Sequence, residues 1–420
     1  MKKLVLLWLC LLAPSVQAAQ FDIYTPEHKP LKLAWIIGSD IENETQRRII
    51  HDVTEQDLNS SQSFVSMDSL SFLNNTSEIF RQVVYSDWRV IGTEILTVAR
   101  LRKTNRGWEV NIAVHDAVLS QLLAQTKLHV KTTQARRLGH LIADFIYETA
   151  LGVKGHFDTH ILYVHKHGKL SDLVYIEQDG SKRQNVGRNF SLLLSPDWSP
   201  NNQLVALNTY VDNRPRLETF HLGTGKRHVF GKFSGLNSTP EWSPDGKYIA
   251  AALSYTGNSE LHLYNVATKK WRQLTHHWAI DTTPTWSPDS KMIAFTSNRS
   301  GKPQIHRVSI KDGLVQQISV VGSYNTTPSW SPRGDRIAFI TRKKWQYALA
   351  TMRADDGTDV RYLVTGGRIE SPSWSPNAQM LLFSREKNGL RSVYRTPSWG
   401  GKAQAITPAN EDASDPSWSH

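Results

Sequence analysis

The sequence predicts a small N-terminal α/β domain followed by an all-β, six-bladed β-propeller whose C-terminal strand closes the ring. Two observations lead to this fold class. A unit marked by tryptophan recurs every 44 residues in the second part of the chain, and each unit carries four short strand-like runs. Units of about 40–45 residues with four strands are typical of propeller blades. We place the N-terminal domain at residues 19–152 and the propeller at 156–420.

The repeat is a tryptophan that is followed by serine and preceded, two positions earlier, by proline. The fullest copies are Thr-Pro-Glu-Trp-Ser-Pro-Asp-Gly-Lys at 239–247 and Thr-Pro-Thr-Trp-Ser-Pro-Asp-Ser-Lys at 283–291. A tryptophan present in every unit is expected to pack between neighbouring sheets, because its ring buries a large apolar area. We therefore predict a structural role for the six repeated tryptophans, Trp198, Trp242, Trp286, Trp330, Trp374 and Trp418.

The strands of one unit can be placed from the copy that begins near residue 239. Its first strand ends at Trp242-Ser243, and β-rich runs follow at 248–253, 261–264 and 271–274. Turn sequences separate these runs, including Pro244-Asp245-Gly246.

The two ends of the repeat region complement each other. Residues 156–190 contain three strand-like runs without a preceding repeat tryptophan, whereas Trp418 ends a first strand that no other strand follows. One C-terminal strand and three N-terminal strands would complete a sixth blade, which closes the ring and leaves no exposed sheet edge.

The N-terminal part has a mixed pattern. Residues 31–37 form an apolar run, 88–98 and 108–114 are strand-like, and 44–58 has apolar residues at helical spacing. The clearest helix is 133–151, with Gly152 as its C-terminal stop. These elements predict an α/β domain joined to the propeller through the link 152–158.

Residues 1–18 have the layout of a secretory signal peptide. Lys2 and Lys3 precede an apolar stretch at 4–12, and small residues stand at Val16 and Ala18. We expect export with cleavage after Ala18. Cys10, the only cysteine, would leave with this segment, so disulfides, zinc–cysteine sites and thiol nucleophiles are not expected.

The positive charge is concentrated in the propeller. Residues 156–420 carry 32 basic and 22 acidic side chains, against 15 and 16 in residues 19–155. Such an excess can indicate nucleic-acid binding, but an exported chain argues against that function. No later run reaches the roughly 18 apolar residues of a membrane-spanning helix.

Motifs of catalysis are not found in the sequence. The segment Gly231-Lys-Phe-Ser234-Gly has the wrong register for a nucleophile elbow. The pairs His165/His167 and His276/His277 imply no third metal ligand, so neither a metal site nor a cofactor is predicted. We expect no enzyme activity. The alternative is a hydrolase accessory or ligand-binding module, because similar propellers are attached to peptidases.

The whole chain after residue 18 resembles the TolB family of the Tol–Pal envelope system. The most specific stretches are Arg136 through Phe157 at the domain junction and Thr283 through Arg299 in the propeller. The resemblance implies a periplasmic, non-enzymatic adaptor that binds the lipoprotein Pal and the inner-membrane protein TolA and supports outer-membrane integrity and constriction during cell division. It also implies a monomer that reaches membranes only through its partners, among which other outer-membrane lipoproteins and colicins are candidates.

The predicted Pal site is the mouth of the propeller, formed by the loops that lead into the first strand of each blade. These loops differ between blades, as an asymmetric partner requires. By the resemblance, Thr282 stands at a family contact position and Leu236 where family members can carry histidine. The predicted contact residues are Leu236, Asn237, Ser238, Thr239, Asp281, Thr282, Asn325, Thr326, Arg368 and Glu370, with Arg342, Lys343 and Lys344 on the rim. We expect an acidic throat inside a basic rim; the alternative is that the rim charges are only solvated and the throat holds a cation.

The predicted TolA site is the segment 19–30 at the start of the N-terminal domain. Phe21 and Ile23 alternate with polar neighbours, as in a strand that adds to a sheet edge. From the residues alone, a frayed terminus or an ordinary first strand is the alternative. The resemblance implies that this segment binds TolA and switches between free and docked states. The predicted contact residues are Gln20, Phe21, Asp22, Ile23 and Tyr24.

Overall fold

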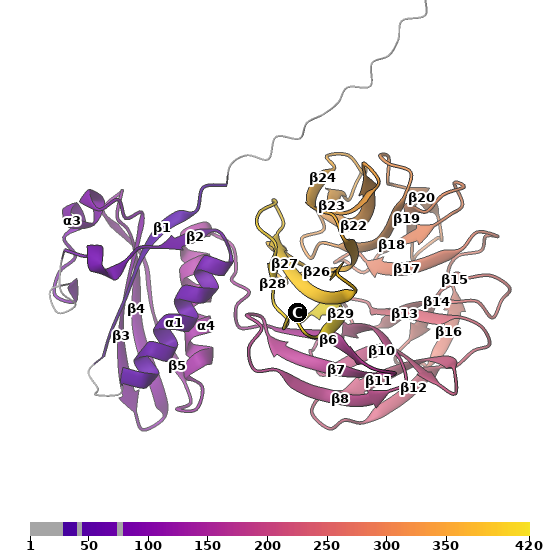
Figure 1. The fold of residues 1–420 in the computed structure, drawn as a ribbon, viewed down its shortest axis with the longest axis horizontal. Helices are drawn as coiled ribbons and strands as arrows, with labels where there is room; N and C mark the ends of the chain where they lie inside the picture. The colour runs from indigo at the N-terminus through magenta and orange to yellow at the C-terminus, as the bar shows by residue number, and fades with distance from the viewer. Residues whose placement is uncertain (1–27, 40–43, 74–78) are drawn as a thin grey trace, which may run out of the picture.

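The computed structural model describes residues 28–39, 44–73 and 79–420, which form two domains (Figure 1). The expected signal peptide and the five predicted TolA contacts lie outside these residues. In the described part of the chain, no helix combines the length and the apolar character needed to cross a bilayer.

The N-terminal domain is a five-stranded sheet in the order β2-β1-β3-β4-β5, covered on one face by two helices (Figure 1). Strand β1 runs parallel to β2 and β3, and the remaining pairs are antiparallel. The strands are β1 (Leu31–Ser39), β2 (Phe64–Ser66), β3 (Ile95–Thr104), β4 (Gly107–Asp116) and β5 (Gln121–Val130). The described helices are α1 (Glu44–Ser60), a 3-10 turn η1 (Ser69–Ser71), α3 (Tyr85–Val90) and α4 (Ala135–Leu151).

Helices α1 and α4 pack closely because Gly139 has no side chain. A Cβ at this position would lie 2.8 Å from the Val53 side chain. The hydroxyl of Thr54 donates to the Gly139 carbonyl at 3.0 Å. As predicted, α4 ends at Gly152, which adopts the left-handed conformation with φ +68°.

The prediction of a strand over 88–98 is wrong in its first half. Trp88 lies on α3, and β3 begins only at Ile95. The Trp88 ring is buried against Phe72, on the sheet face opposite α1 and α4. The apolar residue that suggested a strand therefore belongs to a short covering helix. Strand β5 was not predicted; five of its ten residues are polar, and only Val130 is buried.

The propeller consists of six four-stranded antiparallel sheets, as predicted. We number the blades by their innermost strand. Blades 1–3 are β9–β12 (Leu193–Trp198, Leu204–Val211, Arg214–His221, Arg227–Gly231), β13–β16 (Asn237–Trp242, Tyr248–Leu253, Glu260–Asn265, Lys270–Gln273) and β17–β20 (Asp281–Trp286, Met292–Ser297, Gln304–Ser309, Val315–Gln317). Blades 4 and 5 are β21–β24 (Asn325–Trp330, Arg336–Lys343, Gln346–Arg353, Arg361–Thr365) and β25–β28 (Arg368–Trp374, Met380–Lys387, Leu390–Pro397, Gln404–Ala405).

Blade 6 joins the two ends of the ring and confirms the predicted closure. It contains β29 (Asp412–Trp418), β6 (His160–His167), β7 (Leu170–Glu177) and β8 (Gln184–Phe190), in that order. Figure 1 shows the C-terminus beside β6. Strand β29 pairs antiparallel with β6, and the Trp418 indole donates to the Thr159 hydroxyl at 2.8 Å.

Three of the six repeated tryptophans join the innermost strands of neighbouring blades through their indole N–H groups. The indole N–H groups of Trp198, Trp286 and Trp374 donate to the main-chain carbonyls of Ser417, Glu241 and Ser329, each in the preceding blade, at 2.9–3.1 Å. Trp330 differs from the others, because its ring is only partly buried and its indole bonds within its own turn, to Gly334.

Candidate functional site at the propeller mouth

The face of the ring that carries the loops between blades is hollowed into a cavity of about 540 Å³, which continues down the channel. We call the opening of this cavity the mouth. Five predicted contact residues line it, from four blades: Thr239, Thr282, Thr326, Arg368 and Glu370. The structure therefore brings together residues that lie up to 131 positions apart in the sequence.

Other predicted contact residues support the mouth from behind. Asn237, Asp281 and Asn325 stand at the same position of blades 2, 3 and 4, and all three are fully buried. The Asn237 side chain closes its own loop, accepting from the Phe233 N–H and donating to the Phe233 carbonyl. Leu236 packs its side chain into the blade core, and Ser238 is partly buried outside the cavity lining.

Four of the five carboxylates of the predicted acidic throat are paired with arginines. Asp281, Glu370, Glu411 and Asp412 each lie 2.7 Å from a guanidinium nitrogen, of Arg299, Arg368, Arg183 and Arg391 respectively. The fifth, Asp415, lines the cavity and accepts from the Ser371 hydroxyl at 3.4 Å. The throat is therefore less acidic than the sequence suggested, because most of its carboxylates are compensated by a guanidinium.

Deeper in the channel, Asp197 and Glu241 form an acidic pair that the sequence reasoning missed. Each precedes a repeat tryptophan, and each carboxylate accepts the backbone N–H of the tryptophan in the next blade, Trp242 and Trp286. Burial raises the pKa of both carboxyls, and the nearby Asp197 raises that of Glu241 further. In the sequence, this pair is marked by the position before each repeat tryptophan, where the residue differs between blades.

The residue three positions before each repeat tryptophan adopts a left-handed backbone. The φ angles of all six residues lie between +46° and +53°, and the strand register shifts at this point in every blade. The six residues are Ser195, Thr239, Thr283, Thr327, Ser371 and Asp415. Such bulges re-aim side chains, here in the strands that line the channel.

Two of the three predicted basic residues of the rim lie on aromatic rings. The Arg342 guanidinium stands 4.6 Å from the centre of the Tyr324 ring and 5.0 Å from that of Tyr347. The Lys343 ammonium lies 4.4 Å from the Tyr362 ring, and Lys344 is exposed in the turn beyond. Contacts of this kind hold a cation in place while leaving its charge accessible.

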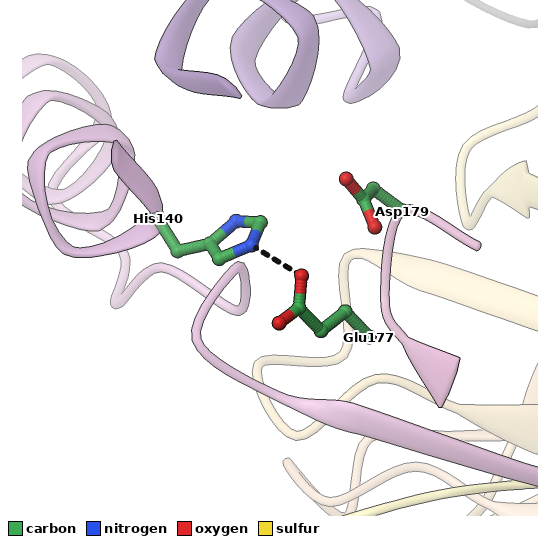
Figure 2. A group of neighbouring side chains, drawn as sticks. All are labelled: His140, Glu177 and Asp179. Carbon is green, nitrogen blue, oxygen red and sulfur yellow. Dashed lines mark hydrogen bonds and ion pairs between the residues drawn. The ribbon is translucent and has the colours of Figure 1, made fainter. Parts of the chain in front are cut away.

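A second polar cluster joins the two domains. His140 on α4 lies between Asp57 on α1, at 2.6 Å, and Glu177 at the end of β7, at 3.3 Å. Figure 2 shows His140 facing Glu177 and Asp179 of the propeller. Together these three side chains have the spacing of a cation site, but Arg136 is ion-paired with both carboxylates. The guanidinium supplies the charge that a cation would bring.

The electrostatics of this junction favour an ionised histidine. Burial alone would lower the pKa of His140, but hydrogen bonds to Asp57 and Glu177 raise it to about 10. Burial raises the pKa of Asp57 to about 6, although the bond to His140 opposes this. The Gln178 amide donates to Asp57, and its side-chain oxygen accepts from the buried Arg395 of β27. Both domains therefore share one network of hydrogen bonds.

An α/β domain tied by buried polar contacts to a six-bladed ring with an open, polar mouth defines a class of two-domain propeller proteins. Residues 147–420 match the family model described as TolB beta propeller domain, and residues 20–123 match the TolB amino-terminal domain. The chain belongs to the TolB family, which confirms the resemblance drawn from the sequence.

Similar proteins occur in several bacteria. The chain is 32% identical over 236 residues to a Tol-Pal system protein TolB of Paramagnetospirillum magneticum, covering 54% of this chain and 53% of that protein. It is 31% identical over 185 residues to the one of Pelagibacter ubique, covering 43% and 42%. The matched region thus spans about half the length of these relatives. The crystal structure of TolB from Acinetobacter baumannii has a TM-score of 0.85 at 28% identity, covering 93% of this chain and 96% of that one.

Proposed function

We propose that this protein is a non-enzymatic adaptor of the Tol–Pal system in the periplasm, where it supports outer-membrane integrity and constriction during division. The observation that carries the proposal is the match of both domains to TolB family models, together with relatives named as Tol-Pal system proteins. An adaptor needs at least two binding surfaces. The propeller mouth and the N-terminal segment are the two candidates.

Pal is the proposed partner of the mouth. The five residues that line the cavity offer hydroxyls and one exposed ion pair, Arg368–Glu370, to a docking protein. Arg342, Lys343 and Lys344 on the rim would attract an acidic partner and accelerate encounter. The buried Asn237, Asp281 and Asn325 act in this proposal as supports that keep the contact loops in position.

TolA is the proposed partner of the segment 19–30, with Gln20, Phe21, Asp22, Ile23 and Tyr24 as contacts. Support comes from the family membership and from the alternation of apolar and polar residues in this segment. The two proposed sites lie in different domains, so each should be separable from the other by mutation.

Binding to a purified soluble Pal domain tests the mouth. Reversing Arg342, Lys343 and Lys344 to Glu should slow association about ten-fold or more at low salt and flatten its salt dependence. The matched control reverses Lys226, Lys269 and Lys311, three exposed lysines in turns on the opposite face of the ring. The Thr282→Trp variant should instead speed dissociation, because its larger ring would fill part of the cavity.

The same assay separates the two partners. A chain lacking residues 19–25 should lose TolA binding and keep its affinity for Pal. Unchanged Pal kinetics in both mouth variants would place the Pal site elsewhere, and retained TolA binding in the shortened chain would reject the segment.

A further inference from the structure

Four blades turn their second strand into their third through two-residue hairpins on the mouth face, and those of blades 1, 4 and 5 share one turn type. The residue pairs that close these three hairpins are Val211 with Arg214, Lys343 with Gln346 and Lys387 with Leu390. In all three the two turn residues have positive φ angles, between +47° and +80°. This is the geometry of a type I′ turn, whose twist matches that of the flanking strands.

One of the three hairpins has residues that this turn disfavours. Two carry the preferred types, Asp212-Asn213 and Asn388-Gly389, which adopt positive φ at little cost. The third carries Lys344 at φ +47° and Trp345 at φ +70°. A bulky residue in this conformation is an outlier. The two sister hairpins form the same turn with small residues, so the fold does not require a bulky residue at this position.

Trp345 is also placed where burial does not stabilise it. The residue is 95% exposed, the largest exposure of any large hydrophobic residue in the described part of the chain. A fully exposed indole in a strained turn contributes nothing to the stability of the blade. Strain of this kind is retained where a function depends on it.

The surroundings of Trp345 connect it to the mouth. Beneath the hairpin, Tyr324 and Tyr347 contact each other with ring centres 6.1 Å apart, and both rings line the mouth cavity. Arg342 lies over these two rings, and its guanidinium donates to the Tyr347 hydroxyl at 3.1 Å. The tip of the hairpin therefore extends a Tyr–Arg surface at the edge of the cavity.

Further apolar side chains continue this edge along blades 2 to 4. Trp278 and Ile280 precede β17, and Val320 and Val321 precede β21; all four are exposed. Asn258 holds the first of these loops through two main-chain carbonyls, and Gln304 donates to Gly322 in the second. Tryptophan, tyrosine and arginine beside a concave surface are the residue types that contribute most to protein interfaces.

We propose that Trp345 is an anchor residue of the mouth, inserted into an apolar pocket on the docking protein. Because Arg342, Lys343 and Lys344 belong to the same hairpin, the receiving pocket should be bordered by carboxylates. The inference rests on the proposed function, since it takes the docking protein to be the lipoprotein Pal. In this proposal, the charges of the rim accelerate encounter, and the Trp345 indole contributes affinity.

Replacing the turn residues with those of a sister hairpin tests this role. The double variant Lys344→Asn/Trp345→Gly has preferred type I′ residues, so its melting temperature should equal or exceed that of the wild type. Its Kd for the soluble Pal domain should rise at least ten-fold, mainly through faster dissociation. The matched control, Asp212→Asn/Asn213→Gly, makes a comparable change in blade 1 and should leave the Kd unchanged.

The outcomes distinguish the inference from the proposed function. If the wild type binds Pal and the blade 4 variant binds with the same Kd, Trp345 is no anchor although the mouth remains the Pal site. If the wild type does not bind Pal, the proposed function fails and the inference fails with it. Vesicles of phosphatidylethanolamine and phosphatidylglycerol form a second arm. Trp345-dependent binding to vesicles with unchanged Pal affinity would assign the hairpin to a lipid surface and overturn the inference.

Discussion

The side chain before each repeat tryptophan links one blade to the next. Asp197 accepts the N–H of Trp242, Glu241 accepts that of Trp286, and the Thr285 hydroxyl accepts that of Trp330. A neutral hydroxyl makes this contact as well as a carboxylate does. The two acidic residues therefore add titratable groups to the channel that the contact itself does not need.

Replacing Glu241 by Gln should stabilise the protein at alkaline pH. The pKa of Glu241 is raised by burial and by Asp197 above its ordinary value of 4.5. Its contribution to stability is therefore complete below pH 4.5 and is lost as pH rises through the folded-state pKa. In Glu241→Gln, the amide oxygen can still accept from the Trp286 N–H and the Thr285 hydroxyl. The amide side chain cannot ionise. Urea unfolding should give a higher free energy for the variant at pH 8 and similar values at pH 4.5. A variant less stable at pH 8 would show that the ionised carboxylate is favoured.

Strand β29 illustrates how a short element can determine the integrity of a ring. It lies between β6 and the innermost strands of its neighbours, and its Ser417 carbonyl accepts from Trp198 of blade 1. The following His420 exchanges hydrogen bonds with Asn202 of blade 1. The strand thus contacts both ends of the propeller chain.

Deleting residues 416–420 should open blade 6. Loss of the buried Trp418 ring alone should cost about 3–5 kcal/mol, and the loss of main-chain pairing adds to this. Thermal unfolding should show a large drop in melting temperature. Trp345→Ala is the matched control, because it removes an indole that is exposed and should change the free energy of unfolding by less than about 0.5 kcal/mol. Equal melting of the shortened and complete chains would contradict closure by β29.

The two domains are connected by the network around His140, whose charge depends on pH. The groups that face it are Asp57, Glu177, Asp179 and Arg136. Since the folded-state pKa of His140, about 10, exceeds its ordinary value of 6.5, the ionised form stabilises the junction. That contribution is complete below pH 6.5 and is lost as pH rises through about 10.

The variant His140→Ala should weaken domain docking most at pH 6 to 7. Calorimetry should show the unfolding of the two domains separating into two transitions, and the loss of stability of the wild type between pH 7 and 10 should be smaller in the variant. His129→Ala, at an exposed position of the same domain, is the control. An unchanged single transition at pH 7 would indicate that other contacts alone hold the domains together.

The repeat architecture could be read from local patterns in the chain. Each blade needs only a β-rich run, a turn and a tryptophan at a regular distance, so the spacing of Trp198 to Trp418 was enough to predict six blades and the closing strand. Helix 133–151 was predicted for the same reason, because its apolar stripe and Gly152 lie within one segment. Five of the predicted mouth residues line the cavity, because their place in the repeat determines which face they reach.

Which residues are paired, buried or exposed depends on contacts between distant parts of the chain. No local pattern shows that Asn237 and Asn325 turn inward, or that Trp88 covers a sheet face. His140 meets Asp57, 83 positions away along the chain, through the packing of α4 on α1, and it meets Glu177, 37 positions away, through the docking of the two domains. Periodicity in the sequence determined the blades and their order, because five of the six blades are built from strands that are consecutive in sequence. The charge and shape of the mouth and of the junction were set by the tertiary structure, since burial and ion pairing arise only when separate segments meet in space.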